Sequence, residues 1–274
     1  MATVMNILFV GDIVGRAGRD LVKKGLKALV AEHDVDLVIA NCENAAAGFG
    51  ITRDIAEELL ACGIDVLTSG NHIWDKKEAL GYIASEPRLL RPGNYPAGAP
   101  GHGSCVVRSR MGLAVGVINI MGRVHMPPLD DPFALVLREV DAIRPKARVI
   151  FVDFHAEATS EKTAMGWHLD GRVTAVAGTH THVQTADERL LPKGTAFITD
   201  AGMTGAHDAI IGMDVAASLA RFLTGMPSRF EPATGNPRLN GVVVHANDES
   251  GLATGIRRIS CSMDELTELA LRHA

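Results

Sequence analysis

Side chains that can bind a metal ion stand directly after short apolar runs at five places in the sequence. Each run has the length and apolar content of a strand that is buried on both faces. Because ligands bind at the carboxyl ends of strands in an open α/β sheet, we expect these side chains to meet in one crevice. Imidazole, carboxylate and amide groups form a mixed nitrogen and oxygen set that suits Fe, Mn or Zn. The residues are Asp12, Glu43, Asn44, Asn71, His72, His155, His180 and His182.

Each of these residues also has an ordinary structural explanation. For the acidic and amide residues, the alternative is a turn or a helix cap. A lone His155 after a buried strand must still satisfy two ring nitrogens, so a structural role and a ligand role explain it equally well. His180 and His182 alternate along an extended segment and project to the same side. The structural explanations would have to hold independently at five strand ends, and this favours a shared site.

Apolar runs and helical patterns alternate along the first third of the chain. This order is typical of parallel βαβ units with right-handed crossovers. It predicts an α/β fold. The expected strands are 6–10, 37–40 and 66–69, and the expected helices are 21–30, 55–60 and 78–84.

The rest of the chain predicts a second sheet. Segments 104–108 and 113–120 flank a turn at Met111-Gly112 and are expected to form an antiparallel pair. Two sheets, each backed by helices, fit the later pattern better than one sheet, and residues 1–274 are expected to form a single domain. The later elements are a helix at 133–143, strands at 148–154, 173–177, 241–246 and 251–260, and a terminal helix from Asp264.

The composition is that of a folded, acidic protein. Of 274 residues, 47% are hydrophobic and 22% are charged, and the net charge is −5, which excludes a disordered chain. An acidic chain lacks the basic face that binding to duplex nucleic acid requires. No apolar stretch reaches the roughly 18 residues of a membrane span, so no membrane partner is expected. Four scattered cysteines indicate a reducing, cytoplasmic environment.

Several weaker signals have mainly structural explanations. The glycines of segment 11–18 match neither a dinucleotide-binding motif nor a P-loop and are expected to pack a helix. Cys42 is expected in the core. His125 and His207 lie in loops that could line a cleft. Three further side chains are expected in the core but could instead contact a base, namely Phe49, Trp74 and Met203.

The order of the candidate ligands resembles that of the calcineurin-like metallophosphoesterases. Their blocks are GD near the start, a bridging acid, GNH, a lone His and GHxH. A closer resemblance is to the YmdB-like branch of bacterial phosphodiesterases, and it covers nearly the whole chain from about Met5. It implies a two-sheet αββα sandwich, with residues 1–4 as an N-terminal extension. The motifs are GDIVGRAGR at 11–19, NCENAAAGFGIT at 41–52, SGNHIWDKKE at 69–78, DFHAEATSEK at 153–162 and GTHTHVQTAD at 178–187.

The resemblance also implies a ligand set for two metal ions. Most members of the superfamily have D-x-H where this chain has Asp12-Ile-Val, and an Asp where it has Glu43-Asn44. The YmdB-like branch shares both changes, with Asn44 in the place of the missing imidazole. Fe or Mn is expected, with Zn as a further candidate. One ion would be held by Asp12, Glu43, Asn44 and His182, and the other by Glu43, Asn71, His155 and His180, with Glu43 bridging.

The implied activity is hydrolysis of a phosphodiester by metal-activated hydroxide, with His72 as the general acid. Cyclic nucleotides such as 2′,3′- or 3′,5′-cyclic AMP are the expected substrates, and a homo-oligomer is expected. A phosphomonoesterase or phosphoprotein phosphatase would use the same cluster. A third alternative is a metal- or nucleotide-binding regulatory protein with weak turnover. His72 favours an enzyme, because a pure sensor would not need it.

Overall fold

Alternate side chains of the central strands enter two different cores. The computed structural model describes residues 4–273. In β1 (Val4–Val10), Ile7 and Phe9 lie between two sheets, and the Phe9 ring is 5.0 Å from that of Phe151 in β7 (Val149–His155). Leu8 and Val10 face helices instead. This alternation follows from the two-residue repeat of a strand, so each sheet contributes side chains to two cores, one on each of its faces.

The first sheet is mixed and has the strand order β2-β11-β12-β1-β3-β4, with β13 paired to β12. β1 runs parallel to β3 and antiparallel to β12. The carboxyl ends of β1, β3 and β4 therefore lie at one edge. The bounds are β2 (Asp12–Ile13), β3 (Leu37–Asn41), β4 (Val66–Thr68), β11 (Met203–Ala206), β12 (Pro237–Asn247) and β13 (Ala253–Ser262).

The second sheet has the order β5-β6-β7-β8-β10-β9. Its strands β6, β7, β8 and β10 are parallel, which again brings carboxyl ends together. β5 pairs antiparallel with β6, as the sequence predicts for 104–108 and 113–120. The bounds are β5 (Ser104–Arg108), β6 (Ala114–Met121), β8 (Ala175–Thr179), β9 (Arg189–Leu190) and β10 (Ala196–Ile198).

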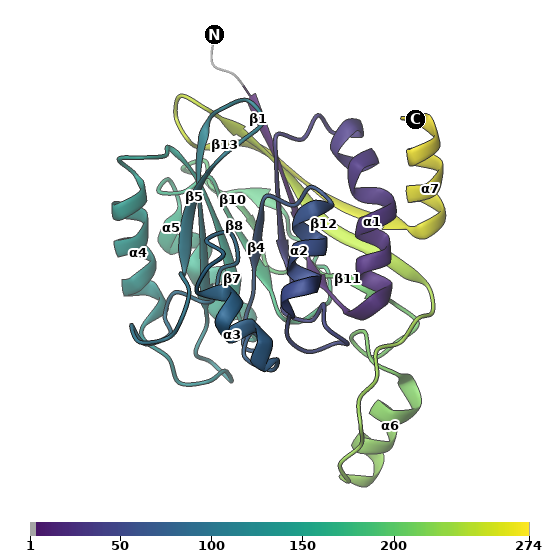
Figure 1. Cartoon of the computed structure of the whole chain (residues 1–274). Coiled ribbons are helices and arrows are strands. Elements are labelled where there is room, and N and C mark those ends of the chain that lie inside the picture. Colours follow the sequence, from purple (N-terminus) through teal and green to yellow (C-terminus); the bar gives the residue numbers. More distant parts are fainter. Residues whose placement is uncertain (1–3, 274) are drawn as a thin grey trace.

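Helices cover the outer face of each sheet, so the predicted two-sheet αββα sandwich is confirmed (Figure 1). On the first sheet these are α1 (Gly15–Glu32), α2 (Arg53–Ala61), α3 (Lys77–Ile83) and α7 (Met263–Arg272). On the second they are α4 (Pro132–Ile143) and α5 (Thr159–Leu169). By contrast, α6 (Val215–Thr224) belongs to the chain segment that connects β11 to β12, and it lies on an arm that projects from the body (Figure 1).

Helix α1 begins at Gly15, six residues before the expected start at Leu21. An added Cβ at Gly18 would lie 2.2 Å from the carbonyl oxygen of Thr204 in β11. Glycine there lets the helix approach the strand closely, as expected for the glycines of segment 11–18.

The sequence patterns do not predict α5, α6 or the short strands β2, β9, β10 and β11. In α5 the buried face includes Glu161 and Lys162, so the helix shows no simple apolar stripe. The strands have two to four residues each, too few for a periodic pattern.

The described N-terminus is part of the first sheet. Val4, which the expected extension includes, pairs with Asn247 in β12. Residues 1–3 lie outside the described residues. Across 4–273, every helix is too short or too polar to cross a bilayer.

Candidate metal centre

Five strand ends, from both sheets, meet at one edge of the sandwich. β1, β3 and β4 come from the first sheet and β7 and β8 from the second. Predicted ligands closely follow four of these strands, and His155 is the last residue of β7. The structure brings all seven predicted ligands into one connected cluster. Donor atoms of Glu43, His155 and His180 lie within 4.8 Å of one another, so this group could hold a metal ion.

Glu43 stands between the two halves of the cluster. Its Oε1 atom lies 3.2 Å from His155 Nε2 and 3.3 Å from Asn44 Nδ2. Asn71 Oδ1 and His180 Nδ1 each lie 3.1 Å from His155 Nε2. A single carboxylate therefore contacts both predicted ligand groups, as a bridging residue must.

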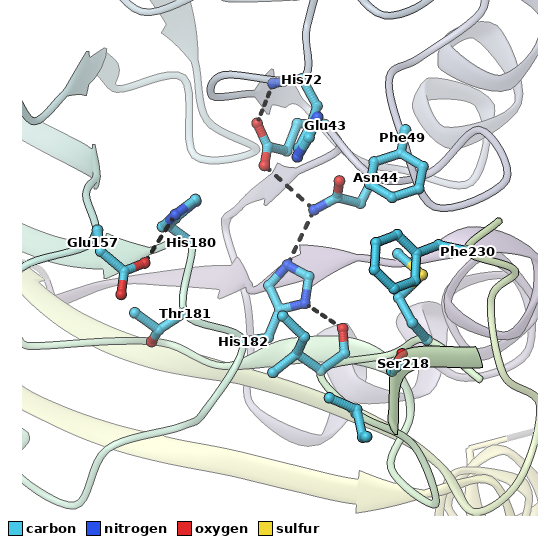
Figure 2. Close-up of a pocket in the computed structure, with 13 residues that line it drawn as sticks. Glu43, Asn44, Phe49, His72, Glu157, His180, Thr181, His182, Ser218 and Phe230 are labelled. Atoms are coloured by element: carbon cyan, nitrogen blue, oxygen red, sulfur yellow. Dashed lines mark hydrogen bonds and ion pairs between the residues drawn. The ribbon is translucent and has the colours of Figure 1, made fainter. Parts of the chain in front are cut away.

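The other half of the cluster comprises His182, Asn44 and Asp12. His182 Nδ1 donates to the carbonyl oxygen of Ile211 at 2.8 Å, which leaves the lone pair on Nε2, 3.1 Å from Asn44 Nδ2 (Figure 2). Asp12 Oδ2 accepts from the backbone N–H of His180 at 3.2 Å. Asp12 Oδ1 is buried and has no hydrogen-bond partner among the described residues, so it is available to a cation.

A chain of hydrogen bonds fixes the tautomer of His155. Its Nδ1 donates at 2.9 Å to Thr179 Oγ1, which donates at 2.7 Å to Asp153 Oδ1. Thr68 and Asn41 donate to the other oxygen of Asp153, at 2.5 and 3.0 Å. Once His155 is neutral, as metal binding requires, the lone pair on Nε2 points into the cluster, an orientation typical of a metal-binding histidine.

The donor set fits a metal ion because its lone pairs face one another. His180 Nε2 lies 3.1 Å from the Glu157 carboxylate, so the ring proton of His180 is on Nε2 (Figure 2). Nδ1 of His180 therefore presents a lone pair to His155 Nε2. Asn71 Oδ1 adds another acceptor at the same nitrogen. Acceptors this close repel unless a proton or a cation lies among them.

Gly70 provides the space that the cluster occupies. A Cβ at this position would lie 2.2 Å from His155 Nε2 and 2.4 Å from Glu43 Oε2. Any side chain here would displace two predicted ligands, which is a physical reason for glycine before Asn71.

A buried ion pair holds the segment that carries two of the histidines. His180 and His182 have φ values of 100° and 65°, so the expectation of an extended segment is wrong. Both residues lie in the left-handed region that costs of order 1–3 kcal/mol per residue. Between them, Thr181 donates its N–H and its hydroxyl to Asp200 Oδ2, at 3.1 and 2.7 Å. Lys162 Nζ lies 2.6 Å from the same oxygen, and both charged side chains are 1% exposed. Through Thr181, this ion pair therefore holds the turn that carries His180 and His182.

The electrostatics of the cluster favour a positive charge at its centre. Burial opposes a charge on His155, yet Glu43 raises the pKa of His155 to about 9. Burial likewise opposes ionisation of Glu43, but His155 lowers the pKa of Glu43 to about 2. Burial and the charge on His155 lower the pKa of His180 to about 3, so His180 is neutral and can act as a ligand. Burial raises the pKa of Asp12.

His72 lies beside the cluster and lines an adjacent cavity of about 370 Å³. Its backbone N–H donates to Glu43 Oε2 at 3.0 Å (Figure 2). Its Nδ1 lies 2.8 Å from Asp75 Oδ2. Its ring contacts Phe49 edge-on, with centroids 5.0 Å apart. Asp75 engages Nδ1, which leaves Nε2 as the ring nitrogen available to a bound molecule.

The other residues considered from sequence differ in position. Phe49 lines the cavity, whereas Met203 and Cys42 are buried in hydrophobic cores. Trp74 packs at the edge of a core and is not among the described residues that line the cavity. His125 and His207 are also not among the described residues that line this cavity, so the prediction that these two could line a cleft is not supported.

Sequence reasoning missed several residues that support the cluster. Asp200 lies two residues after the end of β10, so the strand-end pattern could have indicated it. Asp75 and Glu157 lie inside the motifs at 69–78 and 153–162, but neither motif indicates a role for them. Lys162 is a charged residue on a buried helix face, and no sequence pattern reveals its partner.

The chain is similar to known proteins over nearly its whole length. The family model described as YmdB-like protein matches residues 8–259. A Bacillus subtilis protein named 2′,3′-cyclic-nucleotide 2′-phosphodiesterase is 49% identical over 96% of this chain and 99% of its own length. A Mycoplasma genitalium protein named putative phosphatase/phosphodiesterase is 34% identical over 97% of this chain and 96% of its own length.

Two solved structures share the whole fold. A crystal structure of a hypothetical protein from Thermus thermophilus has a TM-score of 0.87 and 43% identity, covering 94% of this chain and 99% of that one. A crystal structure of a phosphatase from Mycoplasma pneumoniae has a TM-score of 0.89 and 33% identity, covering 96% and 95%. With the family match across most of its length, this chain belongs to the YmdB-like family.

Proposed function

We propose that this protein is a metal-dependent phosphodiesterase that hydrolyses 2′,3′-cyclic nucleotides. The observation that carries the proposal is the convergence of seven candidate ligands in one cluster, four of which line a cavity together with His72. The substrate class rests on the name of the Bacillus subtilis relative. In 2′,3′-cyclic AMP the reaction would break the bond between phosphorus and O2′ and leave a 3′-nucleotide.

We assign two metal ions to the cluster, Fe or Mn first, with Zn as a further candidate. The amide and carboxylate oxygens beside the imidazoles favour such borderline ions. His180 and His182 project from one turn toward different partners, which suits two neighbouring ions. One ion would be held by Asp12, Glu43, Asn44 and His182, and the other by Glu43, Asn71, His155 and His180.

Bound metal ions would neutralise phosphate oxygens and lower the pKa of a water nucleophile. The side chains supply the remaining parts of the mechanism. His72 would donate the proton that the leaving O2′ requires, through Nε2, while Asp75 holds Nδ1. The hydrogen bond from the His72 backbone to Glu43 fixes the distance between the proton donor and the bridging carboxylate.

Two variants test this assignment. His72→Ala is expected to retain metal and lose about 10²- to 10⁴-fold in kcat on 2′,3′-cyclic AMP. Glu43→Ala is expected to lose both metal and turnover. Elemental analysis and rate measurements on each purified protein separate the two effects. Full activity of His72→Ala would disprove its role as the general acid.

A phosphomonoesterase is the second candidate, because the Mycoplasma relatives are named putative phosphatase/phosphodiesterase. The two activities are separated by comparing turnover of bis-p-nitrophenyl phosphate and p-nitrophenyl phosphate. A regulatory, metal-binding protein would gain thermal stability from Mn without a matching gain in rate.

We also propose a cytoplasmic homo-oligomer. All four cysteines are unpaired thiols, which suits a reducing compartment. The projecting helix α6 and the residues after it expose apolar side chains that a second copy could cover. Sedimentation velocity tests the assembly. The side chains, between 45% and 79% exposed, are Val215, Leu219, Phe222, Leu223 and Met226.

A further inference from the structure

The cavity beside the metal centre has an apolar part that the proposed chemistry does not use. In Figure 2, Phe49 and Phe230 lie on one side of Asn44 and His182, and Glu157 lies on the other. A phosphate held at the cluster would therefore leave the rest of a nucleotide facing apolar walls. The apolar lining residues are Phe49, Ile210, Ile211, Met213 and Phe230.

The two aromatic rings are held in place before any ligand binds. Phe49 contacts His72 edge-on at 5.0 Å, and the guanidinium of Arg221 lies 5.1 Å from the centroid of Phe230. Both rings pack against a small buried cluster of Val14, Met203 and Met213. Rigid aromatic surfaces of this kind suit a flat, aromatic ligand group.

Ser218 adds an independent sign of a ligand. It lines the same cavity from α6, is only 3% exposed, and its hydroxyl has no hydrogen-bond partner among the described residues. Thr224 in the same helix instead donates to the carbonyl oxygen four residues before it, at 2.7 Å. An unpaired buried hydroxyl is costly, so a polar ligand atom at this position would be favoured.

We propose that the apolar part of the cavity is a nucleobase subsite. Phe49 and Phe230 contact the base, and the Ser218 hydroxyl forms a hydrogen bond with one of its polar edge atoms. This inference rests on the proposed function, because the sugar and phosphate connect the base to the metal centre. It predicts that the arm carrying α6 contributes to the recognition of the substrate.

The test compares 2′,3′-cyclic AMP with ribose 2′,3′-cyclic phosphate, which lacks a base. Phe230→Leu keeps an apolar side chain but removes the ring, and it is expected to raise KM for cyclic AMP about 10-fold or more at unchanged kcat. Ser218→Ala is expected to raise the same KM about 3- to 10-fold without lowering thermal stability. Neither variant should affect the base-free substrate.

Phe133→Leu is the matched control. Phe133 in α4 is also half-buried and has an edge-on ring contact, with His168 at 5.4 Å, but it does not line the cavity. It should leave both KM values unchanged. If Phe230→Leu and Ser218→Ala impair the base-free substrate as much as cyclic AMP, the subsite is disproved while the phosphodiesterase activity stands.

Calorimetry separates failure of the subsite from failure of the proposed function. Wild-type protein is expected to bind adenosine but not ribose, and both cavity variants should weaken that binding. A wild-type protein that hydrolyses neither phosphodiester disproves the proposed function, and adenosine binding then still decides the subsite. Absence of adenosine binding to the wild type overturns the inference.

Discussion

Replacing Lys162 with methionine should lower the stability of the fold and weaken metal binding, although Lys162 is not itself a predicted ligand. The substitution keeps an apolar stem of similar length but leaves Asp200 without the ammonium group 2.6 Å away. Because both side chains are 1% exposed, the remaining carboxylate would be a buried charge with only hydrogen bonds for compensation. Breaking a pair of this kind by removing one partner costs about 3–5 kcal/mol of unfolding free energy.

The same change should weaken metal binding. Asp200 accepts two hydrogen bonds from Thr181, and these hold His180 and His182 in left-handed backbone conformations. Loss of an outer partner of metal ligands lowers metal affinity about 10- to 100-fold. Urea denaturation of the metal-free protein measures the first effect, and titration with Mn²⁺ measures the second.

Lys23→Met is the matched control, because Lys23 Nζ lies 2.7 Å from Glu58 but the two side chains are 43% and 32% exposed. An exposed pair contributes only about 0–1 kcal/mol. In Lys162→Met/Asp200→Asn, the loss of stability should be smaller than the sum of the two single losses. The reasoning is refuted if Lys162→Met costs no more stability than Lys23→Met, or if it leaves the Mn²⁺ affinity unchanged.

Four further predictions concern the cluster and the adjacent His72. Gly70→Ala should abolish metal binding, because its Cβ would lie 2.2 Å from His155 Nε2, whereas Gly81→Ala has no atom within 4 Å and should bind metal normally in elemental analysis. Burial lowers the pKa of His155, but Glu43 raises it, and the result is about 9. At neutral pH, His155 must therefore release a proton when it binds a metal ion. The apparent affinity should therefore rise about tenfold per pH unit up to about pH 9, and calorimetry in buffers of different ionisation enthalpy should detect the proton. The raised pKa also stabilises the metal-free fold below about pH 6.5, and this contribution should be lost as the pH rises through about 9, which denaturation at several pH values would show. Asp75→Asn should lower kcat by less than His72→Ala while metal content stays constant, and an unchanged kcat would show that Asp75 does not position the ring.

Local sequence patterns are sufficient to predict the elements that carry the chemistry. Short apolar runs followed by Asp12, Glu43, Asn71, His155 or His180 reveal strands and their carboxyl ends, since a strand buried on both faces is apolar throughout. Parallel strands place such ends along one edge, so the existence of one cluster could be predicted. The boundaries of α1 and the position of Val4 could not, because they depend on contacts with β11 and β12.

The groups that support the ligands and the walls around the substrate are defined by the packing of distant segments. Lys162 and Asp200 are 38 residues apart, and neither has a local pattern that names the other. The tautomer of His155 depends on Thr179, and that of His182 on a carbonyl oxygen at Ile211. Ser218 resembles any helical serine until α6 is placed over the cavity. Local sequence encodes backbone preference and burial, whereas hydrogen-bond partners and cavity walls arise only when remote parts of the chain come together.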